Sequence, residues 1–294
     1  MEEVADKVYR LEVPIPKMNI AFGIYLIKES KGILIEPGPS SAVPRIQEGM
    51  KKIGMKDLAY IIPTHMHVDH AGGIGTLARL FPQAKVLVHP RGAKHAIDPS
   101  HLIESTRMVW GVDFEIGLGP LIPVPESQIS VAEDGETISA NSRELQIIYA
   151  PGHAPHQIVI FDRSVSGIFC GDALGLMAHS AKSFPLPNAA PPSFDQELYL
   201  ETMEKLRQLR AHTLFYSHGG VEWEPDALIS MAAENTRVFG DIILRALKEG
   251  ETPEAIIQRV KEHIKSRFGL ELDEVDLEMT VAGYIFYFKK KGLA

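Results

Sequence analysis

Metal-binding side chains are concentrated in residues 65–70, which read His-Met-His-Val-Asp-His. Four of these six residues can ligate a borderline divalent metal, and they directly follow a compact apolar stretch typical of a strand. Side chains alternate along an extended chain, so His65 and His67 point the same way, and a turn after His67 would carry Asp69 and His70 to a neighbouring position. The segment therefore predicts a metal site at the carboxyl end of a strand.

The structural alternative is that these histidines only pack or face solvent, as a lone histidine more often does. Three imidazoles held close together would repel one another when protonated. They would gain nothing from burial unless a cation or hydrogen bonds engaged their lone pairs. For the cluster, unlike for a lone histidine, this favours metal binding.

Three more candidate ligands follow apolar stretches of strand character, namely His153, Asp172 and His218. Each is flanked by a glycine, which permits a tight turn and a close backbone approach to a site. We therefore expect strand ends to deliver them into one crevice. For any one of them alone, a plain turn residue remains the alternative.

The chain as a whole alternates strands and helices in two strand-rich blocks, followed by helices. Expected strands cover residues 8–13, 19–27, 32–36, 58–63, 85–89, 128–131, 136–139, 144–149, 157–161, 167–170 and 213–217. Expected helices cover residues 42–53, 71–80, 93–109, 195–209, 225–248, 252–264 and 273–290. The segment 184–193 contains four prolines, so we expect an extended loop there.

Composition excludes several classes of protein. The formal charge of −8 is interspersed along the 294 residues and offers no broad cationic surface for nucleic acid. The single cysteine, Cys170, rules out an intramolecular disulfide and suits the cytoplasm. Glu2 and Glu3 argue against a secretory signal, and no stretch approaches the ~20 apolar residues of a membrane span. We expect a cytoplasmic protein with a small-molecule substrate and neither nucleic-acid nor membrane partners.

In these residues the chain resembles the metallo-β-lactamase superfamily. Its pattern His-x-His-x-Asp-His, then His, then Asp, then His appears in full and in order, within residues 64–73, 150–153, 171–172 and 217–219. The resemblance implies an α/β (α+β) fold, a four-layer αββα sandwich with a C-terminal helical extension. Residues 1–220 would form the catalytic domain, and residues 221–294 would either pack on it or pair two copies into a homodimer.

The resemblance also implies the roles of the ligands. One metal would be held by His65, His67 and His153, the second by Asp69, His70 and His218, and Asp172 would bridge them. Zinc is the first expectation for both ions, with iron or manganese as alternatives. Asp69 and Asp172 would also orient a hydroxide that cleaves an ester, thioester or lactone.

Other activities remain open within the same family resemblance. An iron-dependent oxygenase of the persulfide dioxygenase kind would use similar ligands, and so would a phosphodiesterase or sulfatase. Flavin-linked di-iron reduction is disfavoured, since His67 stands where those relatives usually have Glu. True β-lactamases often lack histidine at the position of His70 or carry Cys at that of Asp172. A non-enzymatic scaffold is disfavoured because every ligand is present.

Five further residues and one further motif carry weaker expectations. Where many relatives have Asp-Thr-Gly, residues 36–38 are Glu-Pro-Gly, and Glu36 is either an acceptor for a ligand imidazole or a turn residue. Tyr216, His179 and Trp223 lie near ligands or the proline-rich segment and are substrate-binding candidates. Cys170 should point away from the metal side of its strand, so we expect ordinary burial. The motif at residues 88–95, together with residues 193–195, resembles an uncharacterised prokaryotic subgroup.

Overall fold

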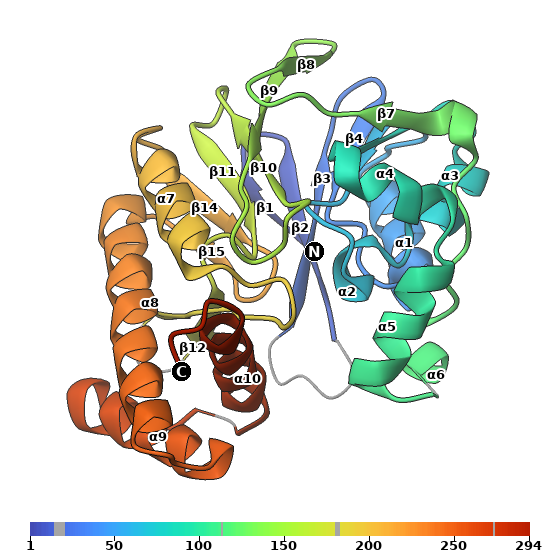
Figure 1. Ribbon diagram of the computed structural model, residues 1–294. Helices are drawn as coiled ribbons and strands as arrows, with labels where there is room; N and C mark the ends of the chain where they lie inside the picture. The colour runs from blue at the N-terminus through green and yellow to red at the C-terminus, as the bar shows by residue number, and fades with distance from the viewer. Residues whose placement is uncertain (15–20, 113, 180–182, 273) are drawn as a thin grey trace. The chain divides into compact units, whose positions relative to one another are not determined.

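The chain forms two units, each with its own secondary structure (Figure 1). The computed structural model describes residues 1–14, 21–112, 114–179, 183–272 and 274–294. The first unit comprises residues 1–149, 156–171 and 211–223, and the second comprises residues 150–155, 172–210 and 224–294. The two units do not test the expected domain boundary at residue 220, which stays a prediction.

The first unit contains a seven-stranded sheet whose strands follow one another in chain order. Strands β1 to β4 are antiparallel neighbours, and β4 to β7 run parallel. The strands are β1 (Glu2–Ala5), β2 (Val8–Val13), β3 (Phe22–Ile27), β4 (Gly32–Ile35), β5 (Leu58–Ile62), β6 (Lys85–Val88) and β7 (Ile129–Val131). The first residues of the strand expected at 19–27 lie outside the described residues.

A six-stranded sheet in the same unit has the order β15-β14-β11-β10-β9-β8. Its strands are β8 (Thr137–Ala140), β9 (Arg143–Tyr149), β10 (Ile158–Asp162), β11 (Gly167–Gly171), β14 (Thr213–Tyr216) and β15 (Val221–Glu222). Neighbours are antiparallel except for β11 and β14, whose parallel pairing places their carboxyl ends at the same edge. The residues that directly follow β11 and β14 in the chain are candidate ligands or neighbours of candidate ligands.

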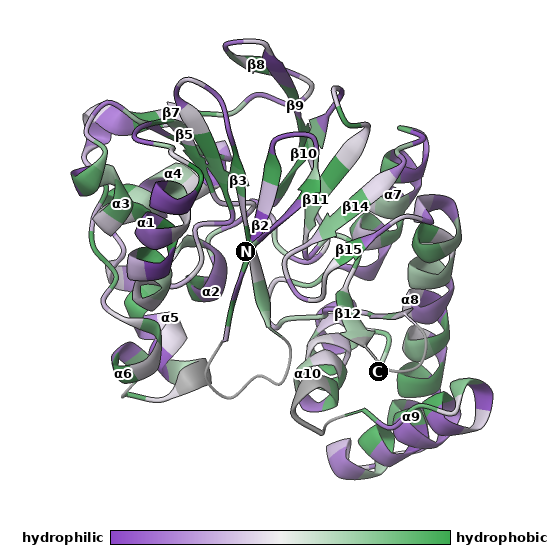
Figure 2. Ribbon diagram, turned by 180° about the vertical axis from the view of Figure 1, so that it is seen from behind, coloured by the Kyte–Doolittle hydropathy of each residue, from purple (hydrophilic) through white to green (hydrophobic). Residues whose placement is uncertain are grey.

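Alternation along β3 explains how one strand serves two cores. Phe22, Ile24 and Leu26 belong to a core shared with helices, whereas Tyr25 and Ile27 belong to a core shared with the second sheet. This is the period of two that a strand buried on both faces requires. Figure 2 shows β3 mainly green, as expected for a strand with a core on each side.

Helices of the first unit cover the outer face of the seven-stranded sheet (Figure 1). They are α1 (Val43–Lys52), α2 (Val68–Ala71), α3 (Ile74–Leu80), α4 (Pro90–Ile97), α5 (Ser100–Trp110) and α6 (Phe114–Leu118), with 3-10 turns at Ser40–Ala42 and Glu126–Gln128. Ile46 and Met50 of α1 lie one turn apart and both enter the helix-side core. The first unit therefore has three layers, one of helices and two of sheet.

The second unit is built on four helices: α7 (Gln196–Arg207), α8 (Pro225–Lys248), α9 (Pro253–Phe268) and α10 (Glu274–Lys290). Two of them begin at a capping residue: Asp195 accepts hydrogen bonds from the first turn of α7, and Thr252 does so for α9. The hydroxyl of Tyr284 in α10 donates to the backbone oxygen of Thr236 in α8 at 2.8 Å. None of the helices in the described part of the chain is long and apolar enough to cross a bilayer.

The proline-rich segment differs in part from the expected loop. Its first residues form β13 (Ser183–Leu186), which pairs with β12 (Leu176–His179) in a two-stranded ribbon. Both strands of such a ribbon are edges, and an edge tolerates Pro185 because a missing backbone N–H can face away from the partner. Only residues 187–193 have no regular structure of the helical or strand type.

Candidate metal centre

The segment 65–70 has the local geometry that its sequence predicts. His65 lies three residues beyond β5, and His67 keeps an extended backbone at φ −66° and ψ 149° before the single turn of α2 begins. Nε2 of His65 and Nδ1 of His67 are 2.9 Å apart, so the two rings do turn to the same side. Asp69 and His70 belong to the helical turn and face a second position.

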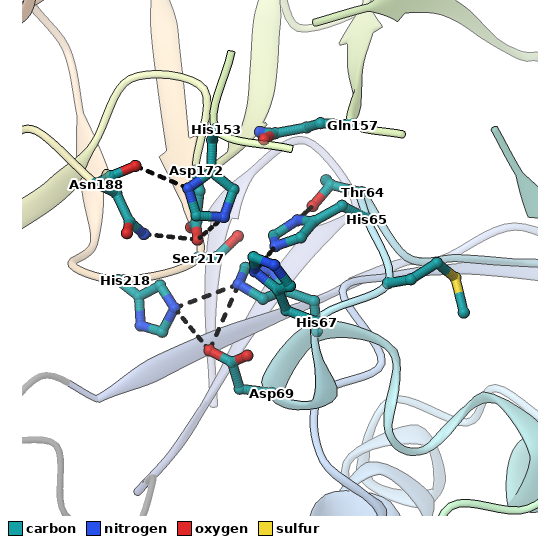
Figure 3. A network of polar contacts seen from close by, with 12 residues as sticks. Thr64, His65, His67, Asp69, His153, Gln157, Asp172, Asn188, Ser217 and His218 are labelled. Carbon is teal, nitrogen blue, oxygen red and sulfur yellow. Dashed lines mark hydrogen bonds and ion pairs between the residues drawn. The ribbon is translucent and has the colours of Figure 1, made fainter. Parts of the chain in front are cut away.

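His218, which follows β14, completes that second position (Figure 3). Its Nε2 lies 3.1 Å from Oδ2 of Asp69 and 3.3 Å from Nε2 of His70. The ligand atoms of all three residues lie within 4.8 Å of one another, and the three side chains are buried. The first unit alone therefore brings together three of the expected ligands of one ion.

Glu36 makes a hydrogen bond to a ligand imidazole, which confirms one of the two roles expected for it. Its Oε2 is 3.0 Å from Nδ1 of His70, and its Oε1 accepts from the hydroxyls of Thr64 and Ser217, at 2.5 and 2.9 Å. Its side chain is 1% exposed. The backbone at Glu36 has a φ of +58°, a conformation that costs a non-glycine residue roughly 1 kcal/mol. Strained residues of this kind are typical of functional sites.

Glu36 also fixes which nitrogen of each histidine carries the proton. Because the carboxylate only accepts, Nδ1 of His70 is protonated and its Nε2 presents a lone pair. The only hydroxyl proton of Thr64 goes to Glu36, so its oxygen must accept from Nδ1 of His65, 3.0 Å away. Nε2 of His65 then presents a lone pair too. The Nε2 atoms of both histidines are thereby left as acceptors or metal ligands.

Nitrogen atoms at these separations need a proton or a cation between them. Nε2 of His70 faces Nε2 of His218 at 3.3 Å, and Nε2 of His65 faces Nδ1 of His67 at 2.9 Å. Buried imidazolium ions in this cluster would repel each other. Imidazole nitrogens with one carboxylate are the donors that suit zinc, iron and similar divalent ions. The residues present thus fit a divalent transition metal.

The second unit holds the two other expected ligands side by side. Nε2 of His153 lies 3.4 Å from Oδ2 of Asp172, and both residues are buried. Asn188 binds both of them, since its Nδ2 donates to Oδ2 of Asp172 at 2.7 Å and its backbone oxygen accepts from Nδ1 of His153 at 2.8 Å (Figure 3). Nε2 of His153 therefore also presents a lone pair. The hydroxyl of Tyr199 donates to the backbone oxygen of Asp172 at 2.7 Å.

Helix α10 holds the loop that carries Asn188. The buried hydroxyl of Thr280 donates to the backbone oxygen of Pro187 at 2.8 Å. At Gly283 an added Cβ would lie 1.8 Å from the backbone oxygen of Ala189, so only glycine permits this approach. Neither Asn188 nor Thr280 was predicted from the sequence, because nothing in a proline-rich stretch or a helix marks a residue that binds a distant ligand. The C-terminal helix therefore supports two of the expected ligands.

Glycine is required beside the ligands, as the sequence indicates. Gly152, next to His153, has a φ of +133°, and an added Cβ would lie 2.3 Å from Cα of Tyr199. Gly171, next to Asp172, has a φ of +51°, and its Cβ would lie 2.4 Å from Oγ1 of Thr64. A larger residue would displace the backbone of Tyr199 at Gly152 and the side chain of Thr64 at Gly171.

The remaining expectations have different outcomes. Burial of Cys170 is confirmed, and this burial raises the pKa of its thiol well above the ordinary value. Tyr216 is fully buried, Trp223 is 65% exposed, and His179 ends β12 with its side chain outside the described part of the structure. Their substrate-binding role stays a prediction. So does the meeting of the ligands of the two units around one pair of ions.

Comparison with known proteins gives a family for the chain. A model described as the Metallo-beta-lactamase superfamily matches residues 24–218, which include every expected ligand. A metallo-beta-lactamase fold-containing protein of Sulfurisphaera tokodaii is 25% identical over 71% of this chain and 76% of its own length. An N-acyl homoserine lactonase of Bacillus cereus is 25% identical over 65% of this chain and 77% of its own length.

A more distant relative is an atrochrysone carboxyl ACP thioesterase of Aspergillus fumigatus, 24% identical over 56% of this chain and 39% of its own length. Among solved structures, a metallo-beta-lactamase family protein of Thermus thermophilus superposes with a TM-score of 0.74, covering 99% of this chain and 95% of its own at 19% identity. This likeness confirms the predicted α/β fold of the metallo-β-lactamase type.

Proposed function

The chain belongs to the metallo-beta-lactamase superfamily, and from that premise we propose that it is a hydrolase that uses two divalent metal ions, zinc first, to cleave an ester, thioester or lactone. In this proposal His65, His67 and His153 hold one ion. Asp69, His70 and His218 hold the other. Asp172 would be a ligand to both ions.

The protonation of the histidines carries this proposal. Glu36, acting directly on His70 and through Thr64 on His65, leaves Nε2 of each ring with a lone pair. The backbone oxygen of Asn188 has the same effect on His153. In each of these three imidazoles the hydrogen bond at Nδ1 selects the tautomer that binds metal through Nε2. This arrangement is typical of histidines that ligate a metal, and ordinary packing does not require it.

When bound, such a pair of ions supplies a nucleophile from water at neutral pH and stabilises negative charge on the substrate. The chain's own groups position that chemistry. The carboxylates of Asp69 and Asp172 would accept hydrogen bonds from the attacking water and orient it. The only thiol, Cys170, is buried and its pKa is raised, so it is unsuited to be a nucleophile.

Two relatives support the proposed class of bond. One is named as a thioesterase and another as a lactonase, and both reactions are attack of water on an activated carbonyl carbon. We therefore place this chain with acyl hydrolases ahead of phosphodiesterases and sulfatases. A small-molecule substrate and a cytoplasmic location complete the proposal.

The test combines metal analysis with a substrate panel. Protein purified without added metal is measured for bound zinc, iron and manganese, and then offered thioesters, lactones, carboxylic esters, phosphodiesters and sulfate esters. We expect two divalent ions per chain and turnover confined to the acyl substrates. The Asp172→Ala variant should lose most bound metal and nearly all turnover, whereas the matched variant Asp226→Ala, at an exposed position of α8, should lose neither.

Two results would contradict the proposal. Full metal content and full turnover in the Asp172→Ala variant would remove the assigned centre. Bound iron together with oxygen consumption, in place of hydrolysis, would instead assign the chain to the oxygenases of this fold.

A further inference from the structure

A buried arginine of β2 contacts the loop that carries His218. Nη2 of Arg10 donates to the backbone oxygen of Gly219, the residue after His218, at 2.9 Å. Arg10 is 8% exposed, so its charged group has lost most of its hydration and depends on its hydrogen bonds to compensate for that loss. The bond to Gly219 thereby joins β2 to the backbone next to an expected ligand.

Strand pairing explains why Arg10 reaches this loop. Arg10 in β2 is paired directly with Tyr25 in β3. Side chains of directly paired residues lie on the same face of a sheet, and Tyr25 belongs to the core shared with the second sheet. Arg10 therefore lies on the face that packs against the second sheet, where most of the neighbouring side chains are apolar.

Tyr25 holds the same loop on the other side of His218. Its hydroxyl donates to the backbone oxygen of Tyr216 at 2.6 Å. Burial raises the pKa of Tyr25 well above its ordinary value, so the hydroxyl keeps the proton that this bond requires. The paired side chains of Arg10 and Tyr25 thus bind the backbone both before and after His218.

The backbone of β3 adds a third contact with this loop. The backbone nitrogen of Gly23 donates to the oxygen of Ser217 at 2.7 Å. Phe22 forms an isolated bridge with His218, and the two rings meet edge to face with their centroids 5.1 Å apart. The strand that holds the loop therefore also packs against the ring of the expected ligand.

The ion pairs of Arg10 do not account for its burial. Arg143, which is buried too, pairs at 2.9 Å with the fully buried carboxylate of Asp162. Glu12, with which Arg10 pairs at the same distance, is 55% exposed, and an exposed ion pair stabilises a fold by about 1 kcal/mol at most. The bond to Gly219 is the contact of Arg10 that burial makes strong.

We propose that Arg10, together with Tyr25, is a positioning residue for His218 that keeps its Nε2 beside Asp69 and His70. The inference rests on the proposed function, in which these three ligands hold one ion. Arg10 and Tyr25 act through the backbone of the loop and contact neither ion nor substrate. A metal ligand has to be held within about 0.5 Å of its productive position, so a looser loop weakens the ion that His218 binds.

The test compares Arg10→Met with the matched variant Glu12→Gln. Methionine fills an apolar interior flexibly but donates no hydrogen bond, whereas Glu12→Gln removes the ion pair and leaves the bond to Gly219 in place. Hydrogen–deuterium exchange of the metal-free protein reports on the loop through the amide of Tyr216, which donates to the oxygen of Gly220 at 2.9 Å. Competition with a coloured chelator measures the affinity for Zn²⁺, and urea unfolding checks that each variant is folded.

We expect the amide of Tyr216 to exchange at least ten-fold faster in Arg10→Met than in wild type. The affinity for one ion should fall about ten-fold, the lower end of the range for groups that support a metal ligand. The amide of Ile147 in β9, three strands away from β14, should exchange at the wild-type rate, which a general loss of stability would not allow. Glu12→Gln should change none of these values.

Tyr25→Phe is a second variant of the same kind, because it removes a different bond to the same loop and keeps the aromatic ring. It should show the same two effects, and it decides the question if Arg10→Met does not fold.

The outcomes separate this inference from the proposed function. Wild-type exchange at Tyr216 in folded Arg10→Met, or faster exchange at unchanged metal affinity, would overturn the positioning role. Equal effects in Glu12→Gln would also overturn it, because they would assign the change to the ion pair. Wild type that binds no metal would contradict the proposed function, while faster exchange confined to Arg10→Met and Tyr25→Phe would still support their hold on His218.

Discussion

Oε2 of Glu36 lies 3.0 Å from Nδ1 of His70, and both side chains are buried. The other carboxylate oxygen accepts from Thr64, whose hydroxyl in turn accepts from Nδ1 of His65. One carboxylate thereby sets the tautomers of two histidines that the proposed function assigns to different ions. The backbone at Glu36 is in the left-handed region, with a φ of +58°.

We therefore predict that Glu36→Gln weakens metal binding by roughly 10–100-fold, the usual effect of removing a hydrogen-bond partner of a ligand. An amide keeps the size of the side chain but can accept at only one atom, so His70 and Thr64 cannot both be satisfied. Competition with a coloured chelator measures the affinity. Glu48→Gln, at an exposed position of α1, is the control, and equal affinity in the two variants would show that Glu36 has no part in holding the metal.

The contact of Thr280 with the loop of Asn188 predicts an effect of the C-terminal helix on metal binding. Thr280→Val removes the bond to Pro187 and should cost about 1 kcal/mol of unfolding free energy and several-fold in metal affinity. Thr236→Val removes an equally buried hydroxyl, bonded to Ala232 within α8, and should cost similar stability at unchanged affinity. Thr280→Ser should restore the affinity. Parallel losses of affinity in both valine variants would reduce the effect to stability alone.

How far the sequence determines this structure differs from one element to the next. Helix α8 begins at Pro225 and ends at Lys248 as expected, because proline at the first helical position and Gly250 after the last are local signals. The paired direction of His65 and His67 is likewise local, since it follows from strand alternation. Where the signal for a structural feature lies within a few residues of it, the sequence alone was sufficient to predict that feature.

Contacts between distant segments could not be predicted in this way. Asn188 binds His153 and Asp172 through a loop whose path depends on α10, and no spacing in the sequence encodes that path. Pro185 was expected outside any strand because the rule concerns central strands, and the two-stranded ribbon offers only edges. Tertiary packing decides both cases.

His89 predicts a dependence of stability on pH. Its Nδ1 accepts from the backbone nitrogen of Arg91 at the start of α4, and burial, with the charge of Arg91, lowers its pKa. The folded state therefore favours the neutral ring. This stability is complete above the ordinary pKa near 6.5 and is lost as pH falls from there through the lower folded pKa.

We expect His89→Asn, which keeps an acceptor at the start of α4 but does not titrate, to lose less stability than wild type between pH 7.5 and pH 5.5. Urea unfolding at both pH values measures the difference. His212→Asn, at an exposed position, should behave as wild type. A wild-type slope that persists in the His89→Asn variant would assign the pH dependence to other groups.

Cys170 should be unreactive in the folded protein. The thiol is fully buried and its raised pKa leaves almost no thiolate at pH 8. A thiol reagent such as dithionitrobenzoate should label no cysteine in native protein and one per chain in guanidinium chloride, because the sequence contains one. Rapid labelling of the native protein would mean that the second sheet opens at β11.

Two glycines of positive φ allow the close approach at Gly152 to be tested separately from its backbone conformation. Gly152→Ala places a methyl group 2.3 Å from Cα of Tyr199, whereas Gly135→Ala, at φ +82°, meets nothing within 4 Å. Both variants incur the cost of alanine in a left-handed or mirror-image conformation, about 1–2 kcal/mol. Only the first must also push the start of α7 away from the residue that precedes His153. We expect Gly152→Ala to lose at least about 2 kcal/mol more unfolding free energy than Gly135→Ala, and to bind metal more weakly. If both variants lost the same unfolding free energy in urea and bound metal equally well, α7 would shift at no measurable cost and His153 would not depend on this contact.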